Sequence, residues 1–135
     1  MNYKKLSILL AVIALFVSTL ACGSNTPAGI SNIYMANDAD GNNKTTTFAP
    51  TDVIFVFFDV NGVDDGAAFQ IKWFALNVDG QDPNEAFLVS DYTYGGEATI
   101  YGQISNSEGG FPPAQYKVEI YLNGAKVGEN LFNIQ

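Results

Sequence analysis

The chain has 135 residues, of which 47% are hydrophobic and 15% charged, with a formal net charge of −8, no histidine and a single cysteine. This length suits one domain with its own core. The missing histidine excludes Ser-His-Asp and Cys-His catalysis and histidine-rich zinc sites, and the acidic charge argues against nucleic acid as a partner. We therefore expect a protein that is not an enzyme and needs no cofactor.

The first 21 residues have the pattern of a secretory signal peptide. Lys4 and Lys5 precede an apolar run over residues 6–21, which ends in small residues directly before Cys22. The run is shorter than the ~20 residues that cross a bilayer comfortably, and it is therefore set apart from the fold.

The sequence TLAC at residues 19–22 resembles the bacterial lipobox, although Thr19 stands where leucine is commonest. The resemblance implies cleavage before Cys22 and a lipid anchor on that cysteine, holding the protein to a cell membrane and facing outside. A lone cysteine also has no disulfide partner within the chain. Cleavage would leave four lysines against fourteen acidic residues, a net charge of −10. A plain signal peptide and an uncleaved anchor helix are the alternatives.

Residues 22–31 are small and polar, and we expect a flexible tether there. Residues 32–135 then predict about seven short strands separated by turn-forming residues. They are expected at 33–36, 53–60, 68–76, 86–89 and 98–104, followed by a C-terminal hairpin. Such a series predicts an all-β, immunoglobulin-like antiparallel β-sandwich, with Trp73 in its core.

The hairpin carries the strongest local signal. Tyr116, Val118, Ile120 and Leu122 alternate with polar or amphipathic residues, and Asn123-Gly124 follows. Asn-Gly is favoured in a type I′ turn because both central residues need positive φ. We expect the apolar face of this hairpin to cover Trp73.

Residues 33–134 resemble a small immunoglobulin-like domain found in lipoproteins and envelope proteins of environmental bacteria, notably the Chloroflexi. The resemblance is carried by FAPTD at 48–52, Trp73, Pro83-Asn84 and the segment 111–124. Phe111 and Ala114 stand where tryptophan and glycine are usual. The resemblance implies the fold and an envelope location, and it implies no specific activity.

Calcium is the one metal for which the sequence contains candidate ligands. Asp38 and Asp40 lie beside Gly41, as hard oxygen ligands do in calcium loops. An EF-hand alignment nevertheless puts Ala36 at the first ligand and Thr47 at the twelfth, where a glutamate is required. We therefore expect no metal, with Asp38 and Asp40 as a weak candidate and a hydrogen-bonded turn as the alternative.

Several large side chains fall on the outward positions of the predicted strands and form a possible partner surface. They are Phe55, Phe57, Phe74, Tyr101 and Tyr121. In immunoglobulin strand order, the first two and Tyr101 belong to one sheet, and Phe74 and Tyr121 to the other. Exposed apolar patches often mark binding sites. Cover by loops and a reversed register are the alternatives.

Together these patterns predict a lipid-anchored, extracytoplasmic, non-catalytic domain that contacts another protein or a component of the cell envelope. A glycan-binding module that uses the outward rings is the alternative. A secreted protease inhibitor presenting residues 105–113 has less support.

Overall fold

A computed structural model describes residues 29–135, so the expected signal peptide 1–21 and the lipidation site Cys22 lie outside the described residues. This part of the chain forms eight strands, and none of it is a helix long and apolar enough to cross a membrane. The strands are β1 (Gly29–Ala36), β2 (Thr47–Phe48), β3 (Ile54–Asn61), β4 (Ala68–Ala75), β5 (Leu88–Thr93), β6 (Thr99–Ile104), β7 (Ala114–Leu122) and β8 (Ala125–Ile134).

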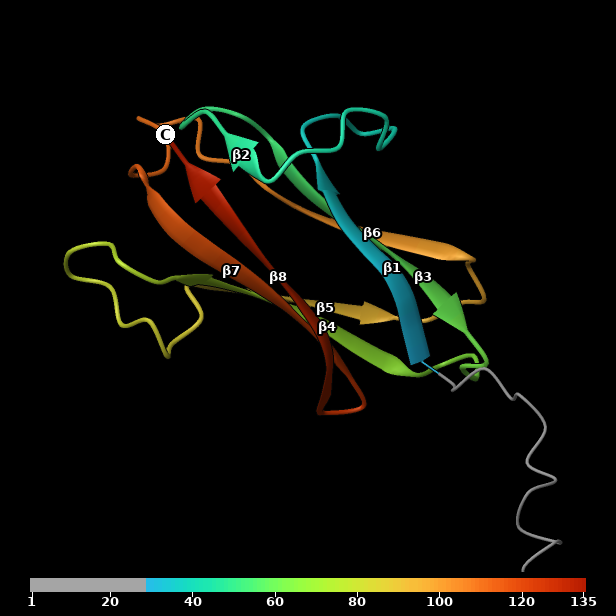
Figure 1. Ribbon diagram of the computed structural model, residues 1–135. Helices are drawn as coiled ribbons and strands as arrows, with labels where there is room; N and C mark the ends of the chain where they lie inside the picture. Colours follow the sequence, from blue (N-terminus) through green and yellow to red (C-terminus); the bar gives the residue numbers. More distant parts are fainter. Residues whose placement is uncertain (1–28) are drawn as a thin grey trace, which may run out of the picture.

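The strands form two sheets packed face to face (Figure 1). One sheet has three strands in the order β1-β3-β6, and the other has five in the order β2-β8-β7-β4-β5. All neighbours are antiparallel except β2 and β8, which are parallel. The predicted all-β, immunoglobulin-like sandwich is therefore confirmed.

Two strands extend beyond their predicted bounds. β1 begins at Gly29, inside the stretch 22–31 expected to be a tether, because residues 29–31 pair with the end of β3. β5 continues to Thr93, where the sequence left a loop or an edge open, because it pairs along the length of β4. In both strands a partner that is distant in sequence supplies the hydrogen bonds that define the element.

The C-terminal hairpin forms as predicted, with φ values of 49° at Asn123 and 84° at Gly124. It does not cover Trp73, however. β7 lies beside β4 in the same sheet, and Val118 is the register partner of Trp73. Both side chains are fully buried, and they face the three-stranded sheet, whose Val56 is buried in the same core. The ring of Phe132 meets Trp73 edge-on at a centroid distance of 5.9 Å.

The two sheets approach each other closely at glycines. A Cβ at Gly128 of β8 would overlap Cδ1 of Ile33 in β1, and one at Gly102 of β6 would lie 2.6 Å from Cδ1 of Ile71 in β4. Each glycine therefore makes room for an isoleucine of the opposite sheet, so that these side chains fill the space between the sheets.

At the start of β7, the hydroxyl of Tyr116 donates a hydrogen bond of 2.8 Å to the carbonyl oxygen of Pro112. A tyrosine in this place, bonded to the backbone a few residues upstream, is the tyrosine corner of immunoglobulin-like sandwiches. Tyr116 is 2% exposed, and burial raises the pKa of its hydroxyl. The bond fixes the chain where it enters the sheet.

Candidate functional site

The outer face of the three-stranded sheet carries an aromatic cluster of Tyr34, Phe55, Phe57 and Tyr101. The register of β1, β3 and β6 aligns Phe57 with both tyrosines. Tyr34 and Phe57 stack at 5.1 Å, and Tyr101 lies 6.1 Å from Phe55 and 5.7 Å from Phe57 between ring centroids. Tyr101 is 57% exposed, whereas Phe55 and Phe57 are each 6% exposed. Tyr101 is therefore the ring of this cluster that a partner could reach most readily.

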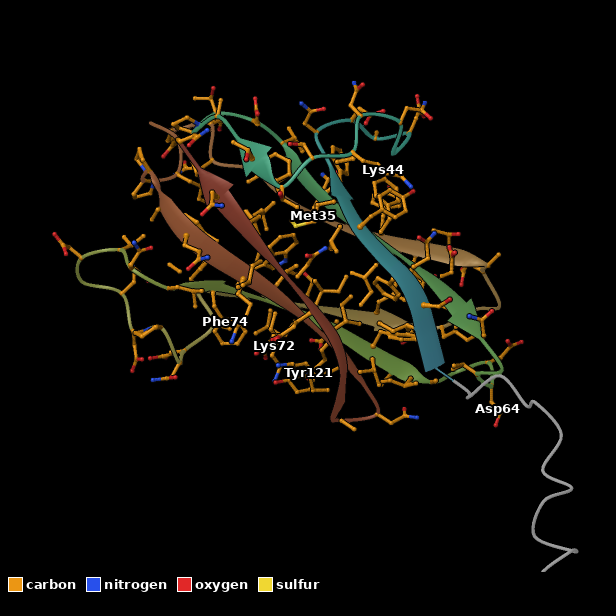
Figure 2. The ribbon with its side chains drawn as sticks, viewed as in Figure 1. Met35, Lys44, Asp64, Lys72, Phe74 and Tyr121 are labelled. Carbon is orange, nitrogen blue, oxygen red and sulfur yellow. The ribbon has the colours of Figure 1, made fainter. Side chains whose placement is uncertain are left out.

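The loop between β1 and β2 accounts for part of the burial of Phe57. Gly41 is itself buried at a φ of 68°, and a Cβ there would lie 3.3 Å from the ring of Phe57. Lys44 adds to the cover, with Nζ 4.0 Å from the centroid of Tyr34, and Figure 2 shows it beside β1. The loop thus folds back onto the aromatic cluster, which corresponds to the alternative that loops cover the outward rings.

Asp38 closes that loop. Its carboxylate accepts the backbone N–H groups of Asn42 at 3.1 Å and Asn43 at 2.8 Å, one on each oxygen. The side chain of Asp40 is exposed, and residues 29–135 hold no group of three or more acidic or cysteine side chains that could bind a metal. Both oxygens of Asp38 thus serve the turn.

A hollow of about 460 Å³ lies beside Tyr101, which is one of its lining residues. Its lining includes Tyr92, Glu97, Thr99 and Gln103. Glu97 also accepts the backbone N–H of Gly95 at 3.0 Å. A hydrogen bond from Tyr92 lowers the pKa of Glu97, and the same bond raises the pKa of Tyr92. The hollow therefore combines a flat ring with carboxylate, hydroxyl and amide groups.

Phe74 and Tyr121 lie on the outer face of the other sheet, apart from the aromatic cluster, as expected (Figure 2). Phe74 is 7% exposed, with Nζ of Lys117 4.8 Å from its centroid. Nζ of Lys72 lies 4.1 Å from the centroid of Tyr121. Lysine side chains thus lie over both rings, and each ammonium group is placed for a cation–π interaction.

Glu119 lies at the centre of this face and is 6% exposed. Its carboxylate lies 2.8 Å from Nζ of Lys117 and 3.3 Å from Nζ of Lys126, and it accepts the hydroxyl proton of Tyr121 at 2.7 Å. Burial alone would raise the pKa of Glu119. Hydrogen bonds from Lys117, Tyr121 and Lys126 outweigh burial and lower this pKa to about 2. These contacts make Tyr121 part of a structural network.

A third feature, which the sequence did not reveal, is an apolar hollow of about 140 Å³ at one end of the sandwich. It is lined by Ala75, Val78, Gln81, Phe87, Phe111, Pro112 and Tyr116. The rings of Phe87, Phe111 and Tyr116 lie 6.2 Å apart in each pairing. Phe87 is 37% exposed, and the next two residues, Leu88 and Val89, are 41% and 43% exposed. The signal for it in the sequence is Phe87, which follows a turn that contains Asp82 and Glu85.

Comparison with known proteins identifies the fold. No protein-family model matches the chain, and no curated protein matches it. Among solved structures, an immunoglobulin-like protein from Pseudomonas aeruginosa is similar with a TM-score of 0.57 and 12% identity, over 84% of this chain and 100% of that one. The alkylpurine DNA glycosylase AlkC from Pseudomonas fluorescens is similar with a TM-score of 0.55 and 11% identity, over 88% of this chain and 33% of that one. At these identities the likeness concerns the backbone, and it shows that this chain has an immunoglobulin-like fold.

Proposed function

We propose that this protein is a lipid-anchored, extracytoplasmic, non-catalytic domain that acts by binding another protein of the cell envelope. The observation that supports a binding role is the apolar surface left open at one end of the sandwich. It comprises the hollow, whose lining includes Phe87, and the exposed side chain of Leu88 at the start of β5. Such a surface is typical of partner sites when polar residues surround it.

The lipid anchor is supported by residues 19–22 and by the position of Cys22 after an apolar run. An acidic domain gains little from electrostatic attraction to anionic lipids, so attachment to a membrane would depend on acyl chains. Outside the cytoplasm, an anchored domain of this kind would present its loops to other envelope proteins.

Membrane fractionation of cells that express the full chain tests the anchor. We expect the wild-type protein and a Ser24→Ala control in the membrane fraction, and Cys22→Ser in the soluble fraction. Retention in the membrane fraction of a Cys22→Ser chain from which residues 1–21 have been removed would show that the anchor is not a lipid on this cysteine.

Glycan binding is a second candidate, and the surroundings of Tyr101 favour it. A half-exposed ring backed by Phe55 and Phe57, beside the carboxylate of Glu97 and the amide of Gln103, has the groups that stack on and hydrogen-bond to a sugar. On a glycan array, we expect Tyr101→Ala to weaken binding about fivefold and Leu131→Ala, on the other sheet, to leave it unchanged. The absence of a dose-dependent signal from the wild-type protein would rule this candidate out.

A further inference from the structure

The end of the sandwich that carries the apolar hollow lies opposite the start of β1. Gly29 pairs with Asn61 at one end of the three-stranded sheet, and the chain passes from there through a short loop into Ala68. β4 then runs to Ala75, which lines the hollow. In Figure 1, the loop that follows β4 extends at the left, and β1 begins at the lower right. An anchor that precedes Gly29 would therefore join the domain at the end opposite the hollow.

The hollow has the size and the lining to hold one apolar side chain. Its volume of about 140 Å³ is close to the ~150 Å³ apolar cavity that accommodates a benzene ring in an engineered protein. Phe87, Phe111 and Tyr116 supply three ring surfaces, and Val78 and Pro112 supply aliphatic ones. An aromatic or branched aliphatic side chain would fill this space and displace water from apolar walls.

The loop over residues 76–87 borders the hollow on one side and carries negative charge. It contains Asp79, Asp82 and Glu85, all exposed, and no lysine or arginine. A second, polar hollow that includes Asp82 and Glu85 adjoins the first, and Gln81 and Phe87 belong to both. A cationic group placed beside the apolar side chain would thus meet two carboxylates.

We infer that this distal face, formed by the apolar hollow and the acidic loop 76–87, binds a protein segment in which an aromatic or branched aliphatic side chain stands next to a lysine or arginine. The inference deepens the proposed function, because it assigns a site and a partner chemistry to the binding domain. The apolar side chain enters the hollow, and the neighbouring cation contacts Asp82 and Glu85. Leu88, also exposed, follows Phe87 at the start of β5, where the rest of the segment can lie.

A random heptapeptide library tests the inference on the full chain held in lipid vesicles. We expect the selected peptides to be enriched in Phe, Leu or Ile next to Lys or Arg. For one selected peptide, Phe87→Ala should weaken binding at least about tenfold, as loss of an aromatic anchor contact does. Leu131→Ala, a change of a similarly exposed apolar residue on another face, should leave binding unchanged.

A charge variant separates the two parts of the site. Asp82 accepts the backbone N–H of Asn84 at 2.8 Å through Oδ1, and asparagine can keep that bond. Asp82→Asn with Glu85→Gln should weaken the selected peptide about threefold at low salt and not at high salt, while the preference for an apolar residue persists.

Three results would overturn the inference. They are a selection without apolar enrichment, peptide binding that Phe87→Ala leaves unchanged, and binding at Phe87 of oligosaccharides but of no peptide. Membrane release of Cys22→Ser concerns the anchor alone, so failure of the anchor and failure of the distal face are distinguished.

Discussion

Glu119 gives the sharpest test of how the five-stranded sheet is held together. Its pKa falls from 4.5 to about 2, because hydrogen bonds from Lys117, Tyr121 and Lys126 outweigh the effect of burial. At ~1.4 kcal/mol per pKa unit, the full shift would correspond to ~3 kcal/mol. Lys126 is 41% exposed and therefore screened by solvent and salt, so we expect Glu119 ionisation to stabilise the fold by about 2 kcal/mol.

The pH dependence follows from the sign of that shift. A carboxyl group whose pKa is lower in the folded chain stabilises the fold above the unfolded pKa near 4.5, and this stabilisation is lost as the pH falls through about 2. Glu119→Gln removes the charge at every pH and resembles the protonated side chain in shape. It should therefore lower the free energy of unfolding by about 2 kcal/mol at pH 7 and by progressively less below pH 4.5.

Urea denaturation at low ionic strength, followed at several pH values, measures this difference without the screening that guanidinium salts add. The matched control is Glu129→Gln, whose side chain is 47% exposed and which should cost less than ~0.5 kcal/mol at pH 7. An equal loss for Glu119→Gln at pH 7 and near pH 2 would refute the reasoning, because the loss would then not depend on ionisation.

Two core features give further predictions. Tyr116→Phe removes the hydrogen bond to Pro112 and should destabilise the fold by ~1 to 2 kcal/mol in urea, whereas Tyr101→Phe, at an exposed hydroxyl, should change stability by less than ~0.5 kcal/mol. Equal effects of the two variants would show that the hydrogen bond of the tyrosine corner does not stabilise the fold. Gly128→Ala should cost ~1 to 3 kcal/mol through overlap with Cδ1 of Ile33, and adding Ile33→Val, which deletes that atom, should recover part of the loss. Strictly additive losses would show that the close approach of the sheets is not the cause.

The parts of this fold that local chemistry specifies could be predicted from the sequence. Asn123 and Gly124 tolerate positive φ, and the alternation of β7 assigns Tyr116, Val118 and Ile120 to the core. The bounds of β1 and β5 could not be predicted in the same way. Gly29 and Thr93 are strand residues only because β3 and β4 supply their partners, and no local pattern contains that pairing.

The candidate sites also contain some features that local sequence predicts and others that depend on contacts between distant segments. Alternation placed Phe57 on an outer face, but its burial depends on a loop whose path is set by the positive φ of Gly41 and by the turn that Asp38 closes. The apolar hollow could not be predicted, because Ala75, Phe87 and Phe111 come from three segments and no local pattern indicates that these segments meet. Only the folded chain brings them together.

On both outer faces of the sandwich, a loop or lysine side chains cover aromatic rings, which makes the end of the sandwich the better candidate for a partner site. On the three-stranded sheet, a loop covers Phe57 and leaves Tyr101 as the accessible ring. On the five-stranded sheet, Lys72 and Lys117 lie over Tyr121 and Phe74, so that a partner would have to displace ordered cations before reaching apolar surface. At the distal end the apolar lining of the hollow is already open, and the nearby charges are carboxylates. A basic, apolar segment would therefore gain contacts there without breaking an existing ion pair.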